Sequence, residues 1–72
     1  METFVPTACD ISDFRAAAGS VGRDCIMGNM ILQAGDGSDA TLLSLGFTAS
    51  EIASHAYSAR IVARRGGAVW TK

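Results

Sequence analysis

Three side chains in this sequence belong to the types that most often ligate zinc or act in nucleophilic and acid–base catalysis: Cys9, Cys25 and His55. Their spacing contains neither a CxxC pair nor an HxxxH pair, the patterns that typically hold zinc. A Ser–His–acid arrangement needs a pre-shaped pocket, which a small helical domain rarely provides. The sequence therefore predicts no catalytic residue, no metal site, no cofactor and no small-molecule substrate, and thus a protein that is not an enzyme.

The remaining polar clusters have ordinary structural interpretations. His55 follows Glu51 by one helical turn, a spacing typical of a surface pair on a helix. The Gly-Asp-Gly-Ser-Asp stretch at 35–39 lacks the Lys-Ser/Thr of a phosphate-binding loop and the further oxygen ligands of a calcium loop. We expect this stretch to be a loop in which Ser38 or Asp36 caps the next helix.

Basic side chains gather in the second half of the chain. Six acidic and two basic residues up to Leu45 give a charge of −4, whereas four basic and one acidic residue from Gly46 onward give +3. Arg60, Arg64 and Arg65 supply most of this positive charge, and they are the residues that would hold the phosphates of a nucleic acid. The asymmetry equally fits helix electrostatics, which favour acids at helix starts and bases at helix ends.

The residues best suited to a protein interface are Tyr57, Ile61 and Trp70. Tyrosine and tryptophan are enriched at interface hot spots, and Tyr57 and Ile61 form an apolar pair on an otherwise polar helix face. Trp70 lies in the C-terminal tail, where it either folds onto the core or stays exposed as an anchor. The structural alternative is that Tyr57 and Ile61 cover Phe4 and Val5 near the N-terminus.

The composition predicts one small folded domain that positions these residues. The chain has 72 residues, of which 49% are hydrophobic and 18% charged, so a packed core is expected rather than disorder. The N-terminus has no basic region followed by an apolar run, and no segment approaches the roughly 18 apolar residues of a membrane span. We expect a cytoplasmic protein that contacts no membrane, with both cysteines reduced rather than joined in a disulfide.

Apolar periodicity and capping signals predict an all-α fold, a compact domain of four helices. The expected helices are at about 11–18, 21–34, 39–45 and 48–65. The expected N-caps, in chain order, are Asp10 or Ser12, Ser20, Ser38 or Asp36, and Thr48. Glycines at 19, 35, 46 and 66–67 are expected to end the four helices. The strongest signal is Thr48-Ala49-Ser50-Glu51, which matches a capping box.

The two longer helices are expected to pack against others by different means. The helix at 48–65 has a narrow face of small residues, which allows another helix to approach closely. Its members are Ala49, Ile52, Ala56, Ala59 and Ala63. The helix at 21–34 is apolar almost all round, with a polar strip at Asn29 and Gln33, so we expect it at the centre of the domain.

The segment Gly46–Ala53, GFTASEIA, resembles the G-x-T-x-x-E-I-A pattern of LuxR-type regulators and is similar to a segment of sigma-factor DNA-binding domains. In those families the segment opens the scaffold helix of a helix–turn–helix, and a separate recognition helix follows in the major groove. The resemblance implies a helix–turn–helix-like second half. The chain departs from the pattern after Ala53, where the sequence can continue as one helix.

Two modes of DNA binding follow from this resemblance. If the last helix breaks near Tyr57, with Ser58 capping a new helix, the final short helix would carry the three arginines to DNA. If the helix does not break, it would itself enter the major groove and present Thr48, Ser50 and Ser54 to the base edges.

We therefore expect a small non-enzymatic regulatory or interaction protein that acts through its helix surfaces. Its partner would be another protein or a second copy in a homodimer. The alternative is a helix–turn–helix DNA-binding transcriptional regulator, although a net charge of −1 provides little long-range attraction for DNA.

Overall fold

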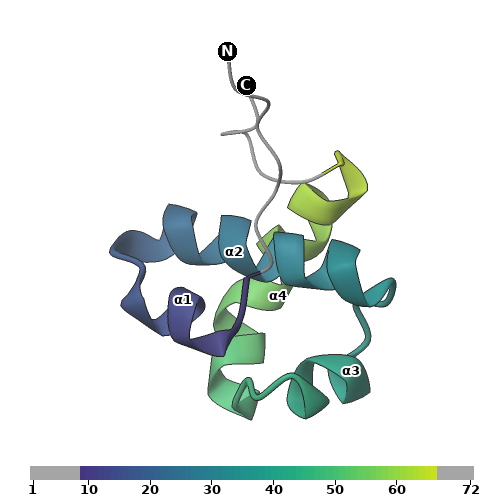
Figure 1. The fold of residues 1–72 in the computed structure, drawn as a ribbon, viewed down its shortest axis with the longest axis horizontal. Coiled ribbons are helices and arrows are strands. Elements are labelled where there is room, and N and C mark those ends of the chain that lie inside the picture. The colour runs from purple at the N-terminus through teal and green to yellow at the C-terminus, as the bar shows by residue number, and fades with distance from the viewer. Residues whose placement is uncertain (1–8, 67–72) are drawn as a thin grey trace.

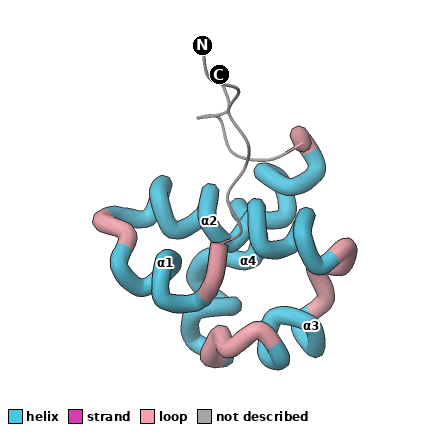
Figure 2. The backbone as a smooth tube through the Cα atoms, viewed as in Figure 1, coloured by secondary structure: helices cyan, strands magenta, loops and turns pink. Residues whose placement is uncertain are grey.

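The computed structural model describes residues 9–66, which form four helices and, within that range, no strand (Figures 1 and 2). The helices are α1 (Ile11–Ala16), α2 (Gly19–Ala34), α3 (Asp39–Ser44) and α4 (Ala49–Arg64). The predicted all-α, four-helix class is confirmed. Trp70, Phe4 and Val5, which entered the predictions above, lie outside the described residues.

Short polar side chains cap the starts of α1 and α3 as their sequences indicate. Asp10, rather than Ser12, caps α1: its carboxylate accepts the Asp13 N–H at 3.1 Å, and the Asp13 carboxylate accepts the Asp10 N–H at 2.9 Å. Ser38 caps α3 by accepting the Thr41 N–H at 3.3 Å. These bonds satisfy amide groups that have no partner within the helix, which is why each helix begins where it does.

The junction between α1 and α2 differs from its prediction. α1 ends at Ala16 because Ala17 adopts an extended conformation, with φ −67° and ψ 140°. Gly19 does not end α1 but begins α2, and its φ of +84° lets the chain enter the new helix at that point. Ser20 is not the cap of α2, because Ala18 occupies the N-cap position without a side-chain hydrogen bond.

α4 runs without interruption from Ala49 to Arg64. The predicted alternative in which Ser58 caps a new helix after a break near Tyr57 is therefore wrong. Ala56 and Ala59, on either side of that point, are both buried against the core. No glycine or proline interrupts the segment, so packing and local propensity both favour one helix.

The core lies where α2 crosses α4, the most extensive contact between two helices (Figure 1). α1 packs mainly against α2, and α3 packs against α4. Phe14 of α1 and Phe47 of the α3–α4 turn meet edge to face in the core, with ring centroids 4.8 Å apart. The buried apolar residues are Phe14, Met27, Met30, Ile31, Leu42, Phe47, Ile52, Ala56 and Ala59.

α2 approaches α4 closely at Gly28. A Cβ atom built on Gly28 would lie 2.7 Å from Val62 Cγ1 and 3.0 Å from the Ala59 carbonyl oxygen. The absence of a side chain at Gly28 therefore sets the separation of the two helices. The small face predicted for the last helix does receive a close neighbour at Ala59.

The predicted polar strip of α2 does not face solvent as a unit. Asn29 is buried, with only 6% of its surface exposed, whereas Val21 is 77% exposed and Leu32 is 44% exposed. α2 is central in its contacts but is not covered on all sides, because only three other helices within residues 9–66 surround it.

Candidate functional site

The start of α4 is held by a network of four residues. The Thr48 hydroxyl accepts the Glu51 N–H at 3.1 Å, and the Glu51 carboxylate accepts the Thr48 N–H at 2.8 Å, which completes the predicted capping box. Arg15 of α1 adds a two-pronged interaction, with its Nε and Nη2 donating to the two Glu51 oxygens at 3.1 and 3.0 Å. Arg15 Nη2 also donates to the Gly46 carbonyl at 3.0 Å, so one arginine joins α1 to the α3–α4 turn.

The Arg15 hydrogen bonds, together with the Thr48 amide, lower the pKa of Glu51 from 4.5 to about 2. Glu51 is therefore ionised at neutral pH and committed to this network. Thr48, predicted as a reader of DNA base edges, has its hydroxyl oxygen occupied as the helix cap.

His55 does not pair with Glu51, contrary to the sequence-based expectation. Its Nδ1 lies 2.8 Å from Asp24 Oδ1 of α2, and only 12% of the His55 side chain is exposed. The imidazole ring also meets Phe14 edge to face, with centroids 5.4 Å apart. His55 thus links α4 to α2 and α1 at the edge of the core. It does not pair with Glu51, because the Glu51 carboxylate already accepts hydrogen bonds from Arg15.

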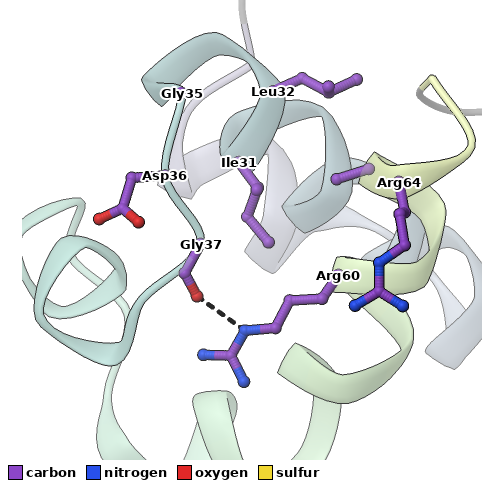
Figure 3. Close-up of a pocket in the computed structure, with 8 residues that line it drawn as sticks. Ile31, Leu32, Gly35, Asp36, Gly37, Arg60 and Arg64 are labelled. Atoms are coloured by element: carbon purple, nitrogen blue, oxygen red, sulfur yellow. Dashed lines mark hydrogen bonds between the residues drawn. The ribbon is translucent and has the colours of Figure 1, made fainter.

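Arg60 is also used within the fold (Figure 3). Its Nε donates to the Gly37 carbonyl at 2.7 Å, and its Nη2 donates to Asp39 Oδ1 at 2.8 Å. The side chain therefore fastens the α2–α3 loop to α4. Of the three arginines predicted to hold phosphates, Arg60 has much of its donor capacity already satisfied.

The α2–α3 loop is stabilised further by Asp36. Its carboxylate accepts hydrogen bonds from the hydroxyls of Ser38, at 2.7 Å, and of Thr41. These bonds, that of Thr41 foremost, lower the pKa of Asp36. Asp36 and Ser38, the two alternative caps for this helix, thus act together, with Ser38 in the N-cap position.

A shallow depression lies between this loop and the end of α4. Its volume is about 270 Å³, and Arg60 and Arg64 border it beside the side chain of Ile31 (Figure 3). The other lining residues are Leu32, Gly35, Asp36, Gly37 and Ala63. It is an open surface feature rather than an enclosed cavity.

The side of α4 that points away from the core carries the other predicted site residues. We call it the outer face of α4 and define it by Ser50, Ser54, Tyr57, Ile61 and Arg64. Ile61 is half-buried and the other four are exposed. Tyr57 is 79% exposed, the highest value among the large apolar residues described.

Arg64 and Arg65 lie at the end of α4, and both are exposed. Within residues 9–66, Arg15 and Arg60 form ion pairs, whereas Arg64 and Arg65 do not. The structure therefore places Arg64 on the outer face of α4, Arg65 at the C-cap of the helix and Arg60 in contact with the α2–α3 loop. Of the three arginines, Arg60 and Arg64 thus border the same depression, and Arg65 lies at the helix end.

The residues with metal-binding and redox chemistry are dispersed. Cys9 and Cys25 are both in the thiol form, and each is half-buried. Burial, followed by the nearby Asp13 and Asp10 carboxylates, raises the pKa of Cys9 and so disfavours its reactive thiolate. Among residues 9–66, no group of three or more His, Cys, Asp or Glu side chains could hold a metal ion.

None of the helices in the described part of the chain combines the length and the apolar character needed to cross a membrane.

Sequence reasoning missed the contacts that tie α4 to its neighbours. Arg15–Glu51 and Asp24–His55 join residues far apart in the chain, and no local spacing signals either pair. The close packing at Gly28 did have a weak indication in the sequence, since a glycine inside a helix often marks close packing.

Comparison of the chain with protein-family models, curated proteins and solved structures finds no match. The helix–turn–helix resemblance therefore rests on the Gly46–Ala53 segment alone and stays a prediction.

Proposed function

We propose that this chain is a small non-enzymatic interaction module that binds a protein partner through the outer face of α4. The observation that carries this proposal is the exposure of Tyr57, 79%, in the middle of an uninterrupted helix. A tyrosine offers a large, rigid contact area with a polar tip at little cost in conformational entropy, and it is enriched at interface hot spots. Ile61, one turn further along, extends the apolar surface.

The contacts of α4 support this proposal because they hold the helix in one position before any partner binds. Arg15 fixes its start, Arg60 fixes its last third to the α2–α3 loop, and the close approach at Gly28 fixes its distance from α2. A surface that needs no reordering loses less entropy on association.

The test compares Tyr57→Ala with Leu43→Ala, a matched control on α3 whose leucine is 53% exposed. The immobilised wild-type chain should capture a partner from extracts of cells that express it. Tyr57→Ala should reduce this capture by about tenfold or more, since hot-spot truncations cost at least about 2 kcal/mol. Leu43→Ala should leave it unchanged. Equal capture by Tyr57→Ala and the wild type would show that the proposal is wrong.

DNA binding, with a role in transcription regulation, is the second candidate function. It is favoured by four exposed polar residues on the outward side of α4, namely Ser50, Ser54, Arg64 and Arg65. This mode uses the unbroken α4 as the helix that enters the groove. A salt-sensitive gel shift that is lost in the double variant Arg64→Ala/Arg65→Ala would support it. The absence of a shift by the wild type at low salt would contradict it.

A further inference from the structure

The outer face of α4 has a spacing suited to pairing with another helix. Ser50, Ser54, Tyr57, Ile61 and Arg64 follow one another at i, i+4, i+7, i+11 and i+14. At 100° per residue they fall within an arc of about 80°, a narrow stripe like the seam of two packed helices. All but Ile61 are exposed, so no other helix of the described residues covers this stripe.

The sizes of the side chains change along the stripe. Its first half presents Ser50 and Ser54, with Ala53 at the edge, and its second half presents Ile61 and Arg64. Tyr57 stands at the midpoint between Ser50 and Arg64. A helix of this kind is complementary to itself when reversed, because large side chains of one copy meet small side chains of the other.

We propose that α4 pairs antiparallel with α4 of a second copy, around a two-fold axis at Tyr57. This inference rests on the proposed function and names the partner as a second copy of the chain. The two Tyr57 rings meet at the axis, and Ile61 of each copy lies over Ala53 and Ser54 of the other. Such isologous packing is the commonest arrangement of homodimers.

Charge complementarity supports the antiparallel orientation. Arg65 and Glu51 project from the same flank of the outer face, and about fourteen residues of helix separate them. Reversing one copy about Tyr57 brings Arg65 within one helical turn of the other copy's Glu51, and the symmetry repeats this pair. The Glu51 carboxylate already accepts Arg15, so Arg65 would add a second cation to this ion pair, and Arg65 forms no ion pair of its own within residues 9–66. A parallel pair would instead place the Arg64 side chains, and the Arg65 side chains, next to their own copies.

Because the pairing surface is a single helix face, we expect it to bury less than the area of about 1,200 Å² that stable complexes bury. A weak dimer is expected, with a dissociation constant between about 10 μM and about 1 mM. Sedimentation of the full chain over this concentration range should show a reversible change from monomer to dimer. Tyr57→Arg, which places two like charges at the axis, should raise the dissociation constant at least about tenfold. Leu43→Arg, at an exposed position of α3, should leave it unchanged.

Cysteine cross-linking tests the orientation separately. In a Cys9→Ser/Cys25→Ala background, oxidising a mixture of Ser50→Cys and Arg64→Cys chains should join the two variants, because an antiparallel pair sets these positions opposite each other. Ser50→Cys alone should not cross-link to itself at a comparable rate. Circular dichroism of each variant confirms that the helices are retained.

Three outcomes overturn the inference. The first is a wild-type chain that stays monomeric at about 1 mM. The second is a dimer that is unaffected by Tyr57→Arg, and the third is Ser50→Cys cross-linking to itself as fast as in the mixture. If the chain stays monomeric but captures a different protein through Tyr57, this inference is overturned and the proposed function stands. If the chain neither dimerises nor captures a partner through Tyr57, the proposed function is overturned as well.

Discussion

Glu51 illustrates how one residue in this domain serves several contacts at once. Its carboxylate accepts the Thr48 amide, which starts α4, and both arms of Arg15, which joins α1 to that start. A carboxylate that accepts several hydrogen bonds is stabilised in its charged form, so the pKa of Glu51 falls to about 2. Removal of its charge would weaken both the helix cap and the contact between helices.

This lowered pKa predicts an acid-sensitive stability. The pKa of Glu51 is about 2 in the folded protein and 4.5 in the unfolded chain. Between these pH values the unfolded chain therefore binds more protons than the folded protein. The Glu51 contribution is thus fully present above about pH 4.5 and is lost as the pH falls through about 2. Urea unfolding of the wild type at a series of pH values in this window should show a falling free energy of unfolding.

Two variants separate Glu51 from the other acids. Glu51→Gln keeps an amide that can complete the capping box but cannot titrate, so its free energy of unfolding should fall less steeply with acid. Arg15→Met removes the leading cause of the lowered pKa, so the pKa of Glu51 should return toward 4.5. An identical acid profile for Glu51→Gln and the wild type would assign the sensitivity to other groups, of which Asp36, whose pKa is also lowered, is the first candidate.

At the scale of the elements, the crossing of α2 and α4 organises the domain. The two helices approach closely because Gly28 faces Ala59 and Val62. On the α2 side, Asp24, the partner of His55, precedes Gly28, and Gly37, whose carbonyl accepts Arg60, follows it. One glycine therefore sets the register that brings both polar contacts together.

Gly28→Ala should destabilise the protein by about 1 to 3 kcal/mol, the usual cost of overpacking a core. The new Cβ would lie 2.7 Å from Val62 Cγ1 and 3.0 Å from the Ala59 carbonyl oxygen, and a backbone atom can move only if α4 moves. This cost exceeds the gain of at most about 1 kcal/mol from the higher helix propensity of alanine. Urea unfolding monitored by circular dichroism measures the difference.

Gly22→Ala is the matched control within the same helix. A Cβ at Gly22 would meet only the Ala17 Cβ, at 3.7 Å, an ordinary contact. This variant should therefore be more stable than the wild type by about 0.5 to 1 kcal/mol. If both substitutions change stability in the same direction and by the same amount, the helix crossing is not limited by Gly28.

At the scale of the whole molecule, the small size of the domain makes a partner energetically important. A chain of 72 residues buries a modest core, so its stability in isolation is limited. Binding of a partner to the folded state alone adds to that stability by mass action. The proposed α4 pairing thus links function to stability.

Thermal unfolding tests this link. If folding is coupled to the α4 pairing, the Tm of the wild type should rise by about 2 °C or more between about 20 μM and about 1 mM chain. Mass action over the expected range of dissociation constants adds about 0.4 to 1 kcal/mol, and about 1 kcal/mol shifts the Tm of such a domain by about 4 °C or more. The Tm of Tyr57→Arg should not depend on concentration. A wild-type Tm that stays constant over this range would contradict the coupling.

The sequence by itself determined the local features of this protein. The all-α class follows from its periodicity, and three of the four helix starts follow from side chains that bond amides within the next three residues, at Asp10, Ser38 and Thr48. The exception is α2, which begins at Gly19 through a backbone conformation rather than through the predicted Ser20 cap. The stripe of Tyr57 and Ile61 was also recognisable from helical spacing alone.

Only the tertiary structure decided which polar residues remain available for a partner. Local spacing predicts a surface pair of His55 with Glu51 and a phosphate-holding role for Arg60, but the fold gives them Asp24, Gly37 and Asp39 as partners. It also keeps α4 continuous, because Ala56 and Ala59 are buried in the packed core. These outcomes depend on residues distant in the chain, whose approach is set by close packing at positions such as Gly28, and local sequence patterns carry no information about such distances.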